Sequence, residues 1–321
     1  MSDTAKALWI TGAGQVEHRD TSIDQSTDHL SIKTLYTGIS RGTERLVLQG
    51  RVPASEHDTM RAPFQEGEFT FPVKYGYAAV GQLQNGDRAG ETVFALFPHQ
   101  TRFAVPEQAV IPVPTDVPAK RAVLAANMET ALNIVWDATI RPGDTVAIVG
   151  CGVVGALTGY LATRIPGTEV RAIDIDPSRS ALAEAIGFGF ATPDAASGDA
   201  DVVIHCSATA EGLATSIALA GVEAKVVEAS WYGEGTTPAA LGGRFHQRRL
   251  QIIGSQVGRI PPQQAARWTY RRRLQKAMSL LADPVLDQLM TGETAFADLP
   301  ARYADILGDP ATLCHAVRYT D

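Results

Sequence analysis

The sequence predicts an α/β protein in which a β-rich unit precedes a doubly wound unit built on a parallel sheet. Short strand-like runs separated by Gly, Pro and Asp fill residues 1 to about 120. Farther along, apolar strands alternate with helix-compatible segments, a pattern typical of a parallel sheet with crossover helices. The 321-residue chain is long enough for two domains, and its 45% hydrophobic content is that of a globular protein.

The first unit contains five strand-like runs with apolar and β-branched residues. In order, they read ALWI, LSIKTLY, AAVGQL, TVFALF and AVIPVP. A long polar stretch at residues 50–71 separates the second run from the third, and we expect it to be a loop. Loops of this length in compact domains are often functional.

The pattern changes after Pro118, where residues 119–138 carry apolar side chains at helical spacing. Strands are expected near 145–150, 169–174, 201–206, 224–230 and 250–255, with helices near 154–165, 177–187 and 209–220. One long helix is expected up to Ala282. The remaining tail is too short to fold alone, so we expect it to return to the first unit. The predicted domains are 1–120 with 262–321, and 121–261.

A glycine-rich turn, GCGVVG, follows the first strand of the second unit. Gly150 permits a tight turn, Gly152 lets the backbone approach a pyrophosphate, and Gly155 permits close helix–strand packing. The helix that starts at Val153 and Val154 offers free N–H groups to phosphates. The turn therefore predicts a Rossmann unit that binds a dinucleotide.

Asp174 closes the second strand of this unit, where a carboxylate can accept hydrogen bonds from both ribose hydroxyls. A 2′-phosphate there would face a negative charge, so we predict NAD rather than NADP. Ser178 and Arg179 leave a second interpretation open, since both can bind a 2′-phosphate. We favour a helix start there, with Asp176 as N-cap and Pro177 in the first turn, and keep Arg179 as a candidate cofactor contact.

Composition excludes several classes of function. A net charge of −7 gives no electrostatic reason to expect a nucleic-acid partner. No apolar run approaches the ~20 residues of a membrane span, and the N-terminus has no signal pattern. Three widely spread cysteines, Cys151, Cys206 and Cys314, suit a reducing compartment. We therefore expect a cytoplasmic protein with a small-molecule substrate and with neither a nucleic-acid nor a membrane partner.

Several segments resemble the medium-chain dehydrogenase/reductase superfamily, the alcohol-dehydrogenase-like group, over essentially the whole chain. They are GISRGTER at 38–45, PVKYGYAAVG at 72–81, NMETALN at 127–133 and the Rossmann block. The resemblance implies a GroES-like catalytic domain, a Rossmann domain, NAD(P)-dependent dehydrogenase or reductase activity, and a homodimer. The segments SRGTE, FPHQ and FHQRRL are most similar to a subgroup that includes bacteriochlorophyllide hydroxyethyl dehydrogenases. That subgroup implies a large planar substrate, a tetrapyrrole or a pterin.

The chain departs from the superfamily at the positions of the catalytic metal ligands. Zinc members carry Cys where this chain has Ser40, a His-Glu pair where it has Tyr77-Ala78, and a third ligand near Glu129. Ser40 and Tyr77 are poor zinc ligands, and one carboxylate does not make a tetrahedral zinc site. The four-cysteine structural zinc lobe is also missing. We therefore predict that the protein binds no zinc.

Without a metal, a side chain must manage the proton on the substrate oxygen. Tyr77 is the leading candidate, because it stands at a former ligand position and a phenol can donate to a carbonyl; an ordinary packed tyrosine is the alternative. His99 has a pKa suited to a proton relay, although a surface histidine is an equal possibility. Thr43 matches the superfamily's hydroxyl relay position, and Ser40 lies close to it in sequence.

Glu129 lies in an apolar helical pattern, where an acid is costly unless it is paired. It is therefore either a site residue, which we favour, or a buried ion-pair partner. Thr130 matches a position near the nicotinamide. Glu44 is expected to pair with Arg41 or Arg45.

The sequence therefore predicts an NAD-dependent oxidoreductase that interconverts a secondary alcohol and a ketone without zinc. Four aromatic residues in and near the 50–71 loop are expected to wall a roomy pocket: Phe64, Phe69, Phe71 and Tyr75. Two other functions stay open, an NADPH-dependent reductase of a C=C bond conjugated to a carbonyl, and a protein that binds a dinucleotide without catalysis.

Overall fold

The computed structural model describes residues 4–24, 26 and 28–320. These residues form two compact units: unit 1 runs up to Ala126 and resumes at Leu274, and unit 2 is Asn127–Arg273. We describe each unit by itself.

Unit 1 contains two β-sheets in the described part of the chain. The larger has the strand order β16-β17-β3-β6-β7-β9, with β8 also paired to β3, and the smaller has the order β2-β1-β5-β4. The strands are β1 (Thr4–Gly12), β2 (Gln15–Ser22), β3 (His29–Ser40), β4 (Glu66–Gly67), β5 (Val73–Lys74), β6 (Ala79–Leu83), β7 (Thr92–Ala95), β8 (Arg102–Pro106), β9 (Val110–Pro112), β16 (Met290–Ala295) and β17 (Cys314–Arg318). Each of the five predicted runs overlaps one of these strands.

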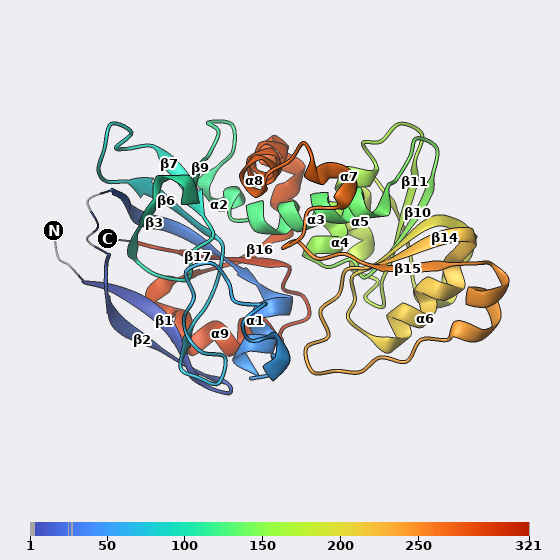
Figure 1. Cartoon of the computed structure of the whole chain (residues 1–321), viewed down its shortest axis with the longest axis horizontal. Helices are drawn as coiled ribbons and strands as arrows, with labels where there is room; N and C mark the ends of the chain where they lie inside the picture. Colours follow the sequence, from blue (N-terminus) through green and yellow to red (C-terminus); the bar gives the residue numbers. More distant parts are fainter. Residues whose placement is uncertain (1–3, 25, 27, 321) are drawn as a thin grey trace. The chain divides into compact units, whose positions relative to one another are not determined.

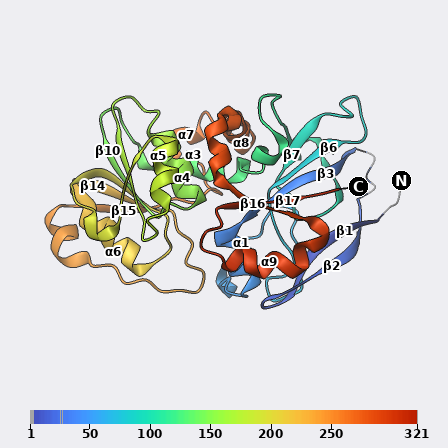
Figure 2. The same ribbon diagram turned by 180° about the vertical axis from the view of Figure 1, so that it is seen from behind.

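The C-terminal tail contributes two strands to the larger sheet. β17 pairs with β3 in antiparallel fashion and places Cys314 opposite Ser40, while β16 pairs with β17 in parallel. Helices α1 (Arg41–Leu48) and α9 (Leu299–Gly308) lie side by side in both views (Figures 1 and 2). The shorter helical pieces of unit 1 are α2 (Ala119–Ala122), η1 (Ala54–Glu56), η2 (Glu107–Ala109), η5 (Leu280–Ala282), η6 (Pro284–Leu289) and η7 (Phe296–Asp298).

Unit 2 is built on a parallel sheet with the strand order β12-β11-β10-β13-β14-β15. The strands are β10 (Thr145–Val149), β11 (Glu169–Ile173), β12 (Gly189–Ala191), β13 (Ala200–His205), β14 (Ala220–Glu228) and β15 (Gln251–Gly254). Because the order reverses at β10, right-handed crossovers put α4 (Val153–Ala162) and α5 (Arg179–Ile186) on one face and α6 (Ala210–Leu219) on the other (Figure 1). The predicted doubly wound sheet is confirmed. Short turns η3 (Pro193–Ala195) and η4 (Leu241–Phe245) complete the unit.

The segment at 262–273, which the sequence assigns to the first domain, lies in unit 2. Arg273 gives the reason, because its guanidinium donates to Glu129 Oε1 at 3.0 Å, to the Asn133 side chain and to the carbonyl oxygen of Val257. All three acceptors belong to unit 2. A cationic side chain that is 2% exposed needs such partners, so it holds its own segment to them.

Two predicted helices are each divided. The stretch predicted as one helix up to Ala282 forms α7 (Pro262–Ala265) and α8 (Tyr270–Ser279). Thr269 explains the break, since its Oγ1 accepts a hydrogen bond from Arg272 N at 3.1 Å and so starts a new helix. The stretch at 119–138 likewise divides into α2 and α3 (Ala125–Ala138). None of the helices in the described ranges is long and apolar enough to cross a membrane.

Arg121 on α2 ties together two parts of unit 1 that are distant in sequence. It donates two hydrogen bonds to the Asp287 carboxylate at 2.7 Å, and one to each carbonyl oxygen of Leu281 and Ala282 at 3.1 Å. We expect Arg121→Ala to lower the free energy of unfolding by about 2 kcal/mol, because these acceptors lose their donor. Urea denaturation followed by circular dichroism measures the change.

Arg88→Ala is the matched control, because Arg88 pairs with Glu91 on the surface. Exposed pairs of this kind contribute about 0–1 kcal/mol. Equal losses of stability in the two variants would contradict the role given to Arg121.

Candidate functional site

The glycine-rich turn of unit 2 packs closely against neighbouring backbone. Gly150 has a φ of 101°, and a Cβ there would lie 2.7 Å from Ser207 N. A Cβ on Gly155 would lie 2.0 Å from the carbonyl oxygen of Gly150. A Cβ on Gly152, by contrast, would meet no described atom within 4 Å. The turn therefore needs glycine at two positions for steric reasons and leaves its backbone open at the third.

Helix α4 begins directly after this open position. Its first residues are Val153 and Val154, with Gly152 as N-cap, and no side chain of the described residues caps this end. The N–H groups of the first turn are thus free to bind an anion, which the helix dipole also favours.

Asp174 lies just past β11 and is held by two backbone N–H groups. Cys151 N donates to its Oδ2 at 2.6 Å and Asp176 N to its Oδ1 at 2.9 Å. Asp176 accepts from Ser178 N at 3.0 Å and lies 3.4 Å from the Arg179 guanidinium. Helix α5 therefore begins at Arg179, later than the predicted start, and Asp176 caps the turn before it. These bonds fix Asp174 beside the glycine-rich turn at the carboxyl edge of the sheet.

These features of unit 2 fit a dinucleotide. The open backbone at Gly152 and the free start of α4 suit a diphosphate, and Asp174 suits ribose hydroxyls. Thr130 lies half-buried on α3 in the same unit. The contacts assigned to Val153, Val154, Thr130 and Arg179 stay predictions.

Glu44 is the centre of a polar cluster in unit 1, and its side chain is 1% exposed. Its Oε1 accepts from Ser40 N at 2.7 Å, and its Oε2 accepts from the Tyr303 hydroxyl at 2.6 Å. The same Oε2 lies 2.9 Å from His99 Nε2. Within the described residues Glu44 has no arginine partner, so the expected pair with Arg41 or Arg45 was wrong. The reason is that Glu44 lies on the buried face of α1, whereas both arginines lie on partly exposed positions.

His99 connects Glu44 to two further polar side chains, Thr37 and Tyr319. Its Nδ1 lies 2.6 Å from Thr37 Oγ1, which lies 3.1 Å from the Tyr319 hydroxyl. With Glu44 accepting at His99 Nε2, the other ring nitrogen, Nδ1, shares its hydrogen bond with the Thr37 hydroxyl. His99 is buried rather than on the surface.

Tyr77 lies beside Ser40 and Thr43, and its phenol hydrogen-bonds to both side chains. Desolvation of the phenol, with the Glu44 charge as a smaller cause, raises the pKa of Tyr77 to about 12. The phenol therefore keeps its proton throughout the neutral range and can donate it. The structure thus brings Ser40, Thr43 and Tyr77 together in unit 1, with Glu44 and His99 in the adjoining cluster.

Glu129 is placed differently from these residues, on α3 of unit 2. Its carboxylate accepts from Arg273 at 3.0 Å, and both side chains are buried. Burial raises the pKa of Glu129, and the Arg273 charge opposes this rise. Of the two alternatives that the sequence left open, the structure shows the ion pair; a site role stays a prediction.

The resemblance matches three positions of this chain to zinc ligands, and the side chains there are poor donors for zinc. Ser40 and Tyr77 offer neutral oxygens that bond to each other, and Glu129 is engaged by Arg273. Zinc sites in proteins use thiolate, imidazole and carboxylate ligands in tetrahedral sets. Among the residues that the structure describes, no group of three His, Cys, Asp or Glu side chains is arranged to hold a metal ion.

Several members of the unit 1 cluster were missed by the sequence reasoning. Thr37, Tyr303 and Tyr319 come from β3, α9 and the C-terminal end, far apart in the chain. No local motif joins them. The one usable signal is that the tail is too short to fold alone and was expected to return to the first unit, which makes its tyrosines candidates.

The aromatic residues expected to wall a substrate pocket divide into two groups. Phe69 and Tyr75 are each 4% exposed, with ring centroids 5.8 Å apart in the core of unit 1. Phe64 is 39% exposed and packs on Phe97, and Phe71 is half-buried.

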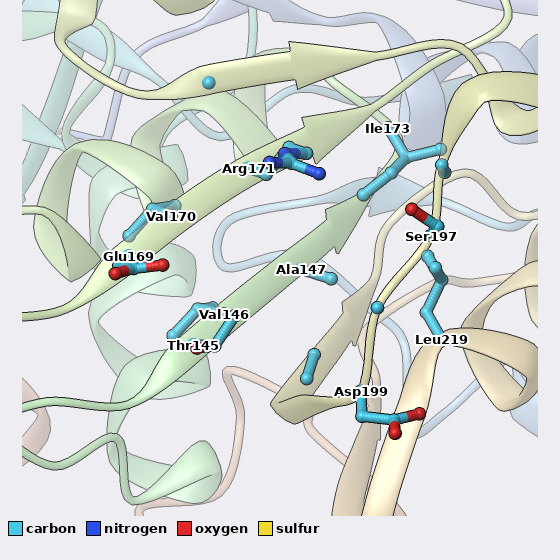
Figure 3. A pocket seen from close by; sticks show the side chains of 14 residues that line it. Thr145, Val146, Ala147, Glu169, Val170, Arg171, Ile173, Ser197, Asp199 and Leu219 are labelled. Atoms are coloured by element: carbon cyan, nitrogen blue, oxygen red, sulfur yellow. The ribbon is translucent and has the colours of Figure 1, made fainter.

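A cavity of about 310 Å³ lies in unit 2 beside β10 and β11 (Figure 3). Thr145, Glu169 and Ala200, which line it, are the first residues of β10, β11 and β13. The cavity is therefore at the amino ends of the strands. Doubly wound sheets bind dinucleotides at the opposite, carboxyl edge, so we do not assign this cavity to a cofactor.

Comparisons with known proteins extend these observations. No family model matches the chain. In sequence, the chain is similar to D-guloside 3-dehydrogenase of Escherichia coli K12, with 27% identity over 201 residues that cover 57% of each protein. The match therefore spans little more than half the length of that relative.

In structure, the chain is similar to two bacterial dehydrogenases over nearly its whole length. L-idonate 5-dehydrogenase of Escherichia coli K-12 matches with a TM-score of 0.79 and 16% identity over 98% of both chains. A protein assigned as a zinc-binding dehydrogenase, from Sinorhizobium meliloti 1021 and bound to NADP, matches with a TM-score of 0.78 and 20% identity over 99% of this chain and 100% of that one.

These structural matches show the fold, a GroES-like unit and a Rossmann unit in one chain. With the sequence match, the comparisons confirm the predicted resemblance to the medium-chain dehydrogenase/reductase superfamily.

Replacing Glu44 tests how much it contributes to the stability of unit 1. Glu44→Ala removes the acceptor of three donors, on Ser40, His99 and Tyr303, and leaves them buried without a partner. We expect the free energy of unfolding to fall by about 3 kcal/mol, measured by urea denaturation. Glu56→Ala, at a partly exposed position, serves as the control. A loss no larger than that of the control would refute the central role of Glu44.

Proposed function

We propose that this protein is an NAD(H)-dependent oxidoreductase that interconverts a secondary alcohol and a ketone without catalytic zinc. The observation that carries the proposal is the protonated phenol of Tyr77, bonded to Ser40 and Thr43 at a position where zinc members carry a ligand. Support also comes from the dinucleotide features of unit 2 and from the similarity to D-guloside 3-dehydrogenase.

The cofactor, when bound, supplies or accepts the hydride. The residues of this chain manage the proton. In the direction of reduction, the carbonyl carbon receives the hydride and the carbonyl oxygen receives the proton of Tyr77. An alkoxide is more basic than a phenolate, so this transfer is favourable even with the pKa of Tyr77 raised to about 12. Solvent water then supplies a proton to the phenolate through the hydroxyls of Ser40 and Thr43, each of which gives up one proton and takes another.

Glu44 and His99 have a supporting role in this proposal. Glu44 binds the backbone of Ser40 and so holds the start of α1, which carries Thr43. His99 orients Glu44 through a hydrogen bond. We therefore assign both as positioning residues. Glu129 is satisfied by Arg273, and we assign it to the packing of unit 2.

Asp174 leads us to propose NAD as the cofactor. A 2′-phosphate would meet its carboxylate, which backbone N–H groups hold in place. For the substrate, we propose a secondary alcohol. The finer suggestion of a tetrapyrrole or pterin depends on the subgroup resemblance. Phe64, the one exposed residue of the four aromatic residues named for the pocket, supports it.

Replacing Tyr77 tests the proposed chemistry. We expect Tyr77→Phe to lower kcat about 100-fold, as for the loss of a general acid, while the dissociation constant for NADH stays unchanged. Steady-state kinetics over a panel of secondary alcohols, sugar derivatives and planar ketones measures the rate. Because the pKa of Tyr77 is raised to about 12, the wild-type reductive rate should not lose this donor between about pH 6 and 10.

Tyr36→Phe is the matched control, since Tyr36 lies on β3 opposite Arg318 and outside the cluster. Unchanged turnover in Tyr77→Phe would remove Tyr77 from the mechanism. A strong preference for NADPH with turnover of conjugated C=C bonds would favour the reductase alternative. Tight NADH binding without turnover over the whole panel would favour a binding protein.

A further inference from the structure

A second row of hydrogen-bonded side chains lies in unit 2, and the proposed proton transfer does not use it. His205 is the last residue of β13 and is 0% exposed. Its Nδ1 lies 2.7 Å from Glu228 Oε2, and its Nε2 lies 2.7 Å from Ser207 Oγ. Ser207 Oγ lies 3.0 Å from Thr209 Oγ1. Four side chains therefore form a continuous line at the carboxyl ends of β13 and β14.

Glu228 fixes the direction of these hydrogen bonds. Burial opposes its charge, but hydrogen bonds from His205 and Ser230 lower the pKa of Glu228, so its carboxylate is ionised and only accepts. His205 Nδ1 must then carry the proton and donate it. With a single ring proton on Nδ1, Nε2 is an acceptor, and the Ser207 hydroxyl donates to it.

The contacts of Thr209 determine the direction of its hydrogen bond with Ser207. Thr209 caps α6, and its Oγ1 accepts from Gly212 N at 3.0 Å. Because the Ser207 hydrogen is used on His205, the Thr209 hydroxyl donates to Ser207. A hydroxyl oxygen has two lone pairs, so Ser207, which is half-buried, keeps one. A ligand group that meets Ser207 must therefore be a hydrogen-bond donor.

Ser207 lies beside the glycine-rich turn. Cys206 N donates to the carbonyl oxygen of Val149 at 2.8 Å, and a Cβ on Gly150 would touch Ser207 N. In doubly wound sheets each half binds one mononucleotide, and the half with the ribose-binding carboxylate, here Asp174, takes adenosine. β13 begins the other half. Ser207 thus belongs to the nicotinamide side.

We propose that the line Glu228–His205–Ser207 positions the cofactor by presenting Ser207 as an acceptor to a hydroxyl of the ribose that carries nicotinamide. Ser207 touches the ligand in this proposal, whereas His205 and Glu228 are positioning residues. The inference rests on the proposed dinucleotide binding and assigns residues that the glycine-rich motif does not include.

The test compares three ligands of the full chain by calorimetric titration: NADH, ADP-ribose, which keeps the second ribose, and ADP, which lacks it. We expect Ser207→Ala to weaken NADH and ADP-ribose about three- to tenfold, the loss of one hydrogen bond, and to leave ADP unchanged. Ser216→Ala is the control, because it removes a buried hydroxyl of α6 that bonds to the carbonyl oxygen of Gly212. All three dissociation constants should stay unchanged there.

Glu228→Gln tests the positioning role separately. An amide N–H facing His205 Nδ1 makes that nitrogen an acceptor and moves the ring proton to Nε2, which then donates to Ser207. We expect the same selective loss for NADH and ADP-ribose, with ADP unchanged. A merely structural role would weaken ADP as well.

Wild-type affinity for NADH in Ser207→Ala, or an equal loss for ADP, overturns the inference and leaves dinucleotide binding intact. Failure of the wild-type chain to bind NADH, NADPH and ADP-ribose overturns the proposed function itself, and the inference with it.

Discussion

The buried carboxylate of Glu44 is the constraint on which the polar interior of unit 1 depends. A carboxylate this deeply buried is tolerated only where donors satisfy it, and Ser40 N, Tyr303 and His99 do so. These donors come from the start of α1, from the tail and from the strand region near residue 99. One side chain therefore joins three distant segments. The hydrogen bond from Ser40 N to Glu44 also fixes the start of α1, and so positions the Ser40 and Thr43 hydroxyls that bond to Tyr77.

In unit 2, by contrast, the site is shaped by glycines, which have no side chain. Gly150 and Gly155 allow backbone contacts that a Cβ would prevent, and Gly152 leaves the backbone open. The polar groups that remain, Asp174 and the Ser207 hydroxyl, are each oriented by hydrogen bonds that leave few alternatives. The chemistry we propose divides accordingly: unit 2 holds the hydride carrier, and unit 1 holds the proton donor.

The sequence predicted the strands, the doubly wound sheet and the steric need for glycine, because these follow from local spacing. Resemblance also named Ser40, Thr43 and Tyr77 as candidates, but it grouped Ser40 and Tyr77 with Glu129, which lies in unit 2. The sequence failed where the decisive partner is distant: Glu44 was expected to bind an arginine close in sequence, yet its partners include Tyr303, 259 residues away. The break before α8 was also missed, because Thr269 competes with an otherwise continuous helical pattern. Burial decides such cases, and burial is set by the whole fold.

The proposed mechanism depends on zinc independence, since this alone requires Tyr77 to replace a metal. The most direct measurement is the zinc content of the purified protein by plasma mass spectrometry, combined with turnover before and after dialysis against a strong chelator. We expect no stoichiometric zinc, and a rate that neither chelation nor added zinc changes. Stoichiometric zinc whose removal abolishes turnover, and whose return restores it, would contradict the account.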